Sequence, residues 1–347
     1  MKLLLSSISE IYRFVVTLLD RETILRKIKG RAEFDVACIT NFETAYQKAF
    51  IGIGKKSIAN GLRYSINGTL VRYILINSDA SSTLKPQKRA TAKQQLYEAI
   101  EYASQKGAKV ILFAASTKRL LSEDEVEKVQ REYDDIVFTI GDNGTSLALF
   151  RDVDDTIVKY ALKKNTHILI IGANGFLGSA IKEKLLKDGY LNIVTSSYKG
   201  SNPFECKKDI RLIIACSHHK KLQLTKDILT QISDKEGVVV VDVCRPKNLS
   251  EKVYKASVNS GLNLVKIESG VFYNHHINYH FKPFAKIVLT NLGLTPNTLY
   301  ACFSEATALA QSGDIDTNIS FMKTNSYALD YVSKSFTKYG YRVNRIK

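Results

Sequence analysis

Short apolar runs alternate with segments of helical periodicity along most of the chain. In the first half, strands are predicted over 70–76, 109–114 and 135–140, and helices over 88–105 and 123–132. Strands that alternate with helices in this way are typical of a parallel sheet covered by helices. The hydrophobic pattern therefore predicts an α/β fold.

A glycine-rich turn near the middle of the chain interrupts this alternation. The apolar run 168–171 is typical of a parallel strand buried on both faces. Gly172, Gly175 and Gly178 follow it at intervals of three, and a helical pattern begins near Phe176. A strand, a glycine turn and a helix in this order form the first part of a nucleotide-binding βαβ unit.

The same alternation continues after this turn. Further strands are predicted over 191–195, 211–216, 237–242 and 263–267. Together with the strand before the glycines, they predict a Rossmann-type doubly wound parallel sheet, preceded by a smaller α/β domain.

The pattern changes near the C-terminus. Thr295 is predicted to cap a helix that has Pro296 as its first residue and runs to about Gln311, and a last helix is predicted over 326–339. We expect three parts: an α/β substrate domain over 1–164, a Rossmann NADP-binding domain over 165–294, and C-terminal helices over 295–347.

The three glycines have distinct expected roles. Gly172 can take a tight turn, Gly175 lets the backbone approach a pyrophosphate, and Gly178 lets the helix lie close to the strand. The alternative is an ordinary tight turn in a sheet that binds no nucleotide.

For a bound cofactor, the expected contacts from this turn and the later strand ends are the three glycines with Asn174, Phe176, Leu177, Cys216, Ser217 and Asp242. The alternative for Asp242 is that it caps the loop that follows it.

The end of the second Rossmann strand selects between the two nicotinamide cofactors. NAD binders usually carry an acidic residue there for the ribose 2′-hydroxyl. This chain has Thr195, Ser196, Ser197 and Lys199 instead. Hydroxyls and a lysine suit a 2′-phosphate, so NADPH is the expected cofactor and these four residues are expected to contact it. The alternative is that Lys199 is a solvated loop charge.

Composition narrows the class of protein. Of 347 residues, 45% are hydrophobic and 24% are charged, as in a globular protein with a substantial core. Lys and Arg number 50 against 34 Asp and Glu, which gives a net charge of +16. Such a charge indicates an acidic partner, either an acidic carrier protein or the surface of an anionic membrane. The alternative is that the charge serves only solubility. The basic residues match no nucleic-acid-binding motif, so no nucleic-acid partner is expected.

The sequence predicts neither export nor a metal site. The first 20 residues read as a helix without a cleavage site, and no apolar run reaches the roughly 18 residues of a membrane span. The five cysteines are odd in number and lack zinc spacing, which favours a cytoplasmic protein without a disulfide framework. His276 and His280 have a helical metal-ligand spacing, but no helix is predicted there.

Cys302 is the candidate nucleophile. It falls within two turns of the start of the helix predicted after Thr295, where the positive end of the helix dipole lowers a thiol pKa. A thiolate and a nicotinamide cofactor together perform thioester or aldehyde redox chemistry. The alternatives are a core role for this thiol and, as a second choice of nucleophile, Cys244. Glu305 is either a catalytic residue or a helix salt-bridge partner, and His275 is a candidate proton donor to the departing thiol.

Four segments carry a resemblance to a known family. They are the glycine turn 172–180, the segment from Asp242 through 246–249, and the segments 269–271 and 301–306. On these segments the chain resembles the long-chain acyl-[acyl-carrier-protein] reductases, the cyanobacterial-type enzymes that convert acyl-ACP to fatty aldehyde. The similarity spans nearly the whole length and is densest after residue 165.

The resemblance implies NADPH-dependent reduction of an acyl thioester, carried by acyl carrier protein or CoA, to an aldehyde. Cys302 matches the cysteine that carries the acyl group in the family, so an acyl-enzyme is implied there. The acyl chain length and the carrier stay open, because the chain departs from the family pattern at Ser197, 243–244, 273–274 and 114–117.

Two other classes of function are compatible with the sequence. One is an oxidoreductase that acts on a small soluble substrate, such as a semialdehyde dehydrogenase or a shikimate-dehydrogenase-like reductase. The other is a non-catalytic nucleotide-binding protein that keeps the glycine turn. Cys302 favours the acyl-thioester reductase, whereas the altered segment 114–117 keeps the non-catalytic alternative open.

Overall fold

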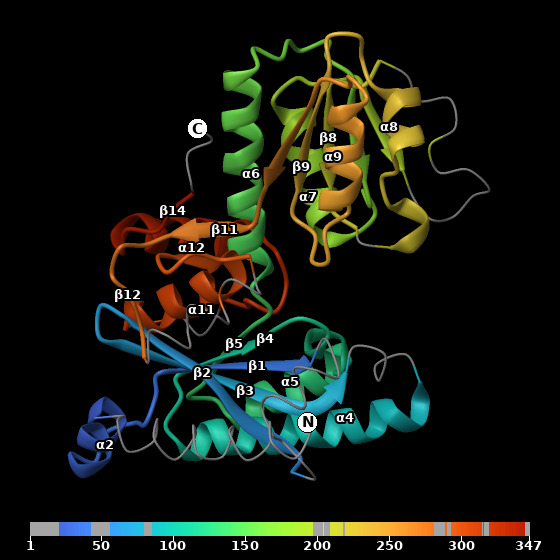
Figure 1. The fold of residues 1–347 in the computed structure, drawn as a ribbon. Helices are drawn as coiled ribbons and strands as arrows, with labels where there is room; N and C mark the ends of the chain where they lie inside the picture. Colours follow the sequence, from blue (N-terminus) through green and yellow to red (C-terminus); the bar gives the residue numbers. More distant parts are fainter. Residues whose placement is uncertain are drawn as a thin grey trace. The chain divides into compact units, whose positions relative to one another are not determined.

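The chain divides into two compact units (Figure 1). The computed structural model describes residues 21–42, 56–79, 85–196, 204, 209–217, 219–280, 289, 293–313, 315 and 319–343. The first unit contains residues 1–143 and 273–342, and the second contains residues 144–272 and 343–347. These boundaries differ from those expected at 164 and 294, because residues 144–164 group with the second unit and residues 273–342 return to the first.

The first unit is built on a six-stranded sheet in the order β12-β2-β3-β1-β4-β5. Four strands run parallel: β3 (Thr69–Asp79), β1 (Val36–Phe42), β4 (Val110–Phe113) and β5 (Val137–Thr139). The strand β2 (Ile58–Ile66) is antiparallel to both β3 and β12 (Ile277–Tyr279). Because parallel strands end at the same edge of a sheet, the loops after β1, β4 and β5 gather at one edge.

Helices cover both faces of this sheet (Figure 1). Apolar residues of α4 (Pro86–Gln105) and α5 (Glu123–Glu132) join one face in a single buried cluster. On the other face lies α11 (Ala301–Ser312), which packs against β1, β3 and β4 and against α12 (Ser326–Lys338). The unit also contains α2 (Arg21–Ile28) and the short 3-10 helix η2 (Thr117–Arg119).

The second unit is a five-stranded parallel sheet, as the sequence predicts. Its order is β10-β9-β8-β6-β7, formed by β6 (Ile168–Ile171), β7 (Ile193–Ser196), β8 (Leu212–Ala215), β9 (Val238–Asp242) and β10 (Leu264–Glu268). The helical elements are α6 (Asp142–Lys159), α7 (Phe176–Lys187), η3 (Lys220–Leu222), α8 (Lys226–Ile232) and α9 (Glu251–Asn259). The strand order reverses beside β6, and ligands of doubly wound sheets bind at such a switch point.

The helix predicted to begin at Pro296 begins at Ala301 instead. Pro296 occupies the second position of a turn closed by the Thr298 N–H, which donates to the Thr295 carbonyl at 3.0 Å. Proline has the same φ at the start of a helix and at this turn position, so the sequence alone does not separate the two. Strand β13 (Thr298–Tyr300) then joins a small sheet with β11 (Val271–Tyr273) and β14 (Arg342–Val343).

The other predicted strands and helices that fall within the described residues are confirmed with shifted ends. The strands β1 and β2 were not predicted. The helix expected in the first 20 residues, Ser197 and Lys199 lie outside the described residues.

Candidate functional site

The glycine turn joins β6 to α7 and leaves no room for side chains at two positions. Gly172 has a φ of 82°, and an added Cβ would come within 2.6 Å of the Ser217 Cβ. A Cβ on Gly178 would strike the Gly172 carbonyl and come within 2.8 Å of the Ala173 Cα. These contacts agree with the roles predicted for the two glycines, the tight turn and the close approach of helix to strand.

Gly175 lies in open space at the N-terminus of α7. An added Cβ would meet only the Gly172 carbonyl oxygen, at 3.4 Å, and the neighbouring Asn174 and Phe176 are exposed. Gly175 is the N-cap of α7 and, as a glycine, has no side chain that could cap the helix. Uncapped N–H groups at the switch point of a parallel sheet suit a pyrophosphate. These residues therefore fit the phosphates of a nicotinamide cofactor.

A Gly175→Ala substitution tests this fit. Because φ is −87° and the surroundings are open, alanine should change the free energy of unfolding by less than about 1 kcal/mol. A methyl group would obstruct a pyrophosphate held against the turn, so NAD(P)H affinity should fall roughly tenfold or more. Fluorescence titration measures the affinity, and urea unfolding measures the stability. Unchanged affinity for both NADH and NADPH would contradict phosphate binding here.

The residues that were expected to select the cofactor are only partly described. At the end of β7, Thr195 is exposed and Ser196 is buried. Ser197 and Lys199, on which the preference for a 2′-phosphate depends, lie outside the described residues. The preference for NADPH therefore stays a prediction.

Cys216 and Ser217 follow β8 at the edge of the sheet that carries the glycine turn. The Ser217 carbonyl accepts a hydrogen bond from Asn248 Nδ2 at 2.7 Å, and its hydroxyl accepts one from the His219 N–H at 3.3 Å. Burial raises the pKa of the Cys216 thiol to about 12, with a smaller contribution from the Asp242 carboxylate. Cys216 is therefore a protonated thiol beside the turn.

Asp242 anchors the loop after β9. Its two carboxylate oxygens accept hydrogen bonds from the N–H groups of Cys244 at 3.0 Å and Leu249 at 2.9 Å. The buried Cys244 thiol donates to the Ala215 carbonyl at 3.2 Å, and burial raises its pKa. The loop-capping alternative accounts for both oxygens of Asp242, and Cys244 has the contacts of a core thiol.

The sequence did not single out Asp152, a carboxyl group on α6 that is 4% exposed. Burial raises its pKa from 3.8 to about 7, against the opposing effects of the Ser269 hydroxyl, the Gly270 N–H and the Lys247 ammonium. The folded chain thus retains a proton that the unfolded chain releases at a lower pH.

This raised pKa predicts a pH-dependent stability. Because the folded state binds the extra proton between pH 4 and 7, stability should fall as the pH rises through that window and level off above it. Asp152→Asn should match the wild type at pH 4 and be more stable at pH 8, by roughly 4 kcal/mol at most. Urea unfolding at both pH values tests this, with the exposed Glu127→Gln as the control. An equal difference at both pH values would contradict the assignment.

Cys302 is the second residue of α11, closer to the helix start than predicted. The residue is partly exposed, and the N–H of Phe303 donates a hydrogen bond to its sulfur. Gly141, after β5, packs directly on it: an added Cβ would come within 2.6 Å of the Cys302 Cα. The thiol therefore lies beside the loop that follows β5, in the first unit.

The pKa of the Cys302 thiol is raised, which corrects the expectation of a lowered value. Burial is the largest cause and raises it to about 12. The Lys118 ammonium lowers the pKa, the carboxylates of Asp142 and Glu305 raise it, and the Phe303 N–H lowers it slightly. Loss of solvation thus outweighs the helix N-terminus and the cation, and the thiol is protonated at neutral pH.

An ion pair next to Cys302 was missed by the sequence analysis. Lys118 Nζ lies 2.8 Å from Asp142 Oδ1, and the two side chains are 30% and 7% exposed. Lys118 comes from η2 after β4, and Asp142 begins α6 after β5. Two features of the sequence could have drawn attention to these loops: the sharp turn after Gly141, and the departure of 114–117 from the family pattern.

Glu305 is buried one turn after Cys302 on α11. Its Oε1 accepts hydrogen bonds from the Thr139 hydroxyl at 2.5 Å and from Asn143 Nδ2 at 3.5 Å. The same Thr139 hydroxyl accepts a hydrogen bond from the Gly141 N–H at 2.9 Å. Glu305 therefore ties α11 to the loop after β5.

His275 lies in an exposed turn between β11 and β12. Its ring packs on that of His276, with centroids 3.7 Å apart. The charged groups that act most strongly on the Cys302 thiol are Lys118, Asp142 and Glu305. His275 is not among them, so nothing here supports it as the proton donor. His276 is not helical, and the described residues contain no group of three or more His, Cys, Asp or Glu arranged for a metal.

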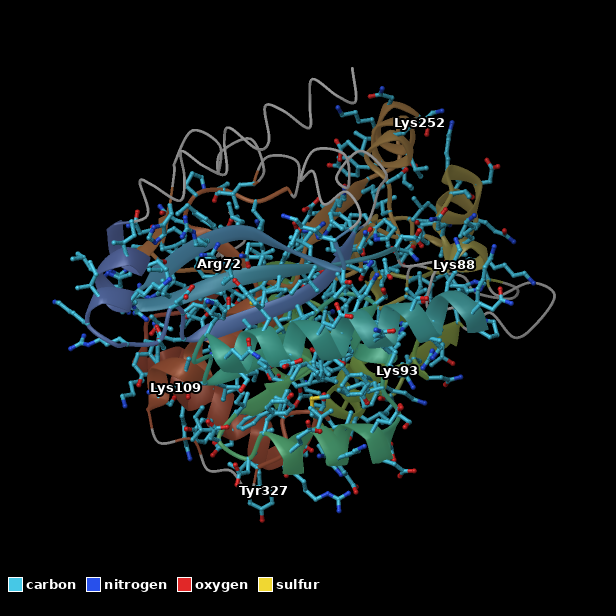
Figure 2. The ribbon with its side chains drawn as sticks, turned by 90° about the horizontal axis from the view of Figure 1, so that it is seen from below. Arg72, Lys88, Lys93, Lys109, Lys252 and Tyr327 are labelled. Carbon is cyan, nitrogen blue, oxygen red and sulfur yellow. The ribbon has the colours of Figure 1, made fainter. Side chains whose placement is uncertain are left out.

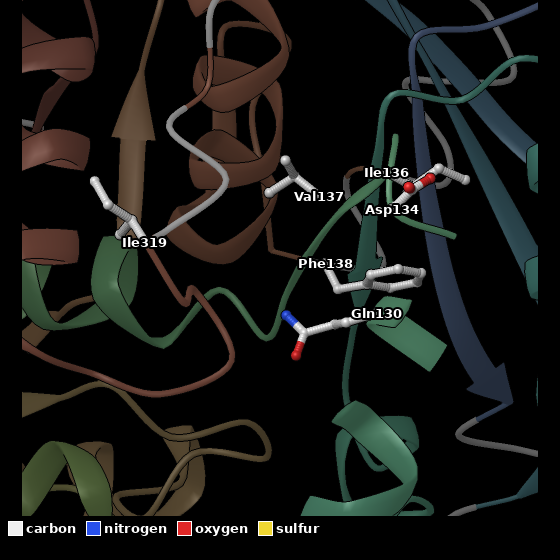
Figure 3. Close-up of a pocket in the computed structure, with 6 residues that line it drawn as sticks. All are labelled: Gln130, Asp134, Ile136, Val137, Phe138 and Ile319. Carbon is white, nitrogen blue, oxygen red and sulfur yellow. The ribbon is translucent and has the colours of Figure 1, made fainter. Parts of the chain in front are cut away.

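Basic side chains are distributed over many elements. Figure 2 shows Lys88 and Lys93 along α4, Lys109 before β4 and Lys252 on α9. A pocket of about 70 Å³ in the first unit, between the end of α5, β5 and Ile319, does not include Cys302 in its lining (Figure 3). Among the described helices, none is long and apolar enough to cross a membrane.

Comparison with solved structures gives low similarities. A malic enzyme of Entamoeba histolytica has 11% identity and a TM-score of 0.42, with 95% of this chain and 79% of that chain covered. An NAD-dependent malic enzyme of Thermotoga maritima has 12% identity and a TM-score of 0.37, with 96% and 90% covered. The bifunctional FolD of Campylobacter jejuni has 14% identity and a TM-score of 0.33, with 76% and 89% covered. Similarities at this level identify no function.

Sequence comparison characterises one segment, which lies mostly in the second unit. No curated protein matches the chain. Residues 168–281 match the NAD dependent epimerase/dehydratase family, whose members bind a nicotinamide cofactor on a Rossmann-type sheet. The match begins at β6 and includes the glycine turn. The segment therefore contains an NAD(P)-binding domain of Rossmann type, whose five strands lie in the second unit, and its last residues, 273–281, belong to the first unit.

Proposed function

We propose that the chain is an NADPH-dependent reductase that converts acyl thioesters to aldehydes through an acyl-enzyme on Cys302. The observation that carries the proposal is the position of this thiol. Among the described cysteines, Cys38 and Cys244 are buried, whereas Cys216 and Cys302 are partly exposed. Of these two, Cys302 lies at a helix N-terminus, that of α11, and is acted on by the charge of Lys118. The resemblance of 301–306 to the acyl-ACP reductases supports the same residue.

The first half of the proposed reaction is acyl transfer. The Cys302 sulfur attacks the carbonyl carbon of the carrier thioester, a new carbon–sulfur bond forms, and the bond to the carrier sulfur breaks. The thiol proton of Cys302 ends on the released carrier thiol, so atoms and charge balance. Backbone N–H groups at the start of α11 are donors suited to the oxyanion that forms on the way.

The second half is reduction of the Cys302 thioester. NADPH, when bound at the glycine turn, supplies the hydride for the carbonyl carbon. Cys302 leaves as the thiolate, the aldehyde is released, and a solvent proton restores the thiol. The net charge of +16 suits an acidic acyl carrier protein as the donor of the acyl group, although CoA thioesters have the same reactive bond.

Incubation with palmitoyl-ACP, or with palmitoyl-CoA, tests the proposal without nucleotide. We expect a palmitoyl mass increase on the tryptic peptide 287–323, in which Cys302 is the only cysteine. Addition of NADPH should then release the aldehyde and restore the peptide mass. No adduct from either carrier, with NADPH binding intact, would overturn the proposal.

A non-catalytic nucleotide-binding protein is the second candidate. The raised pKa of Cys302 favours it, because a protonated thiol is a weak nucleophile. The same experiment separates the two candidates, since this protein would bind NADPH and form no adduct.

A further inference from the structure

Lys118 and Asp142 meet at the edge of the first-unit sheet where β4 and β5 end. The two strands are parallel neighbours, with Leu112 opposite Thr139, so their following loops lie side by side. Lys118 Nζ and Asp142 Oδ1 are 2.8 Å apart. Asp142 is mostly buried, whereas the lysine is partly open to solvent. The carboxylate therefore fixes the ammonium at this edge.

The segment that carries Lys118 is itself firmly held. The Thr117 hydroxyl donates to the Ala114 carbonyl at 2.6 Å and to the Ile39 carbonyl at 3.2 Å. The Ser116 hydroxyl and N–H donate to Asn41 Oδ1 at 2.8 and 3.2 Å. These bonds fasten the start of η2 to the end of β1, so the backbone of Lys118 has a defined position.

Cys302 lies at the same edge. Gly141 immediately precedes Asp142 and packs on the Cα and Cβ of Cys302. The helix α11 also packs against β4, the strand that leads to Lys118. The thiol therefore shares one small region of the first unit with the ion pair.

The charges around Cys302 leave Lys118 with a distinct role. The groups that interact electrostatically with the thiol include Lys118 after β4, Asp142 on α6, Glu305 on α11, Cys38 on β1 and Tyr73 on β3. Burial raises the pKa of Cys38 and Tyr73, so both are neutral. The two carboxylates disfavour a thiolate, and among these groups Lys118 alone favours it.

We propose that the Lys118 ammonium, held in place by Asp142, stabilises the thiolate of Cys302. This inference rests on the proposed function, in which the thiolate occurs twice: as the attacking group in acyl transfer and as the group expelled when the aldehyde forms. Lys118 acts through its charge and transfers no proton. Its charge lowers the energy of both thiolate states and leaves the neutral thioester between them unaffected.

Alkylation of Cys302 by iodoacetamide measures the thiolate directly, with peptide 287–323 as the reporter. We expect Lys118→Met and Lys118→Gln to shift the pH profile upward by about one unit, a roughly tenfold lower rate at pH 8. Lys118→Arg keeps the charge and should stay within about threefold of the wild type. Lys128→Met, which removes an exposed lysine of α5, is the matched control and should change nothing.

The outcomes separate this inference from the proposed function. Wild-type profiles for both neutral variants, with unchanged thermal unfolding, would overturn the role of Lys118 even if the acyl adduct forms. An equal loss in Lys118→Arg would also overturn it, because charge would then not be the cause. The alkylation assay needs no acyl substrate. A pH profile that is shifted in the neutral variants, without any acyl adduct in the wild type, would therefore overturn only the proposed acyl transfer and not the role of Lys118.

Discussion

Replacing Cys302 by alanine is expected to lower the rate of aldehyde formation from an acyl thioester roughly 10⁴-fold or more. The proposed reaction forms its covalent intermediate on this sulfur, and losses of such size are typical when an enzymatic nucleophile is removed. Alanine at the second residue of α11 keeps the Cβ and removes only the thiol group. Aldehyde formation and NADPH consumption with palmitoyl-ACP measure the effect.

Cofactor binding provides the control for this variant. The substitution leaves the glycine turn intact, so NADPH affinity should stay near the wild-type value. Substantial aldehyde formation by Cys302→Ala would rule out the acyl-enzyme.

The second large effect is expected for Gly141→Ala, which should destabilise the protein by about 2–5 kcal/mol. The φ of Gly141 is 71°, a conformation that costs an L-residue roughly 1–2 kcal/mol. An added methyl group would also strike the Cα and Cβ of Cys302, and overpacking of this kind costs roughly 1–3 kcal/mol. Urea unfolding measures the sum.

Gly340→Ala separates the two contributions. Gly340 belongs to the same unit and has a φ of 75°, but an added Cβ would meet nothing within 4 Å. It should therefore show the conformational cost alone. Equal destabilisation by the two substitutions would mean that Gly141 does not pack tightly on Cys302.

Local patterns predicted most of the fold. The apolar run 168–171 and the spacing of the three glycines after it depend only on residues that are close in sequence. The structure has β6, the turn and α7 where these patterns predicted them. Pro296 shows the limit of such signals. It serves equally well in a turn or at a helix start, and the pairing of β13 with β11, a long-range contact, decides between them.

The surroundings of Cys302 were less predictable because they come from distant parts of the chain. Lys118, Asp142 and Glu305 follow or face different strands of one sheet, and only the strand order brings them together. The helix-end position of the thiol was a correct local prediction. The direction of its pKa was wrong, since burial, which the sequence does not report, outweighs the helix end.

The division of the chain also has a consequence for biosynthesis. Residues 144–272 of the second unit emerge from the ribosome as one stretch, whereas the first unit needs 273–342 to supply β12, α11 and α12. At roughly 5–20 residues per second, the nascent first sheet waits several seconds or more with the α11 face uncovered. Residues 1–143 are thus made first, but the unit to which they belong is completed last. During that interval their uncovered sheet face is where a chaperone would be needed.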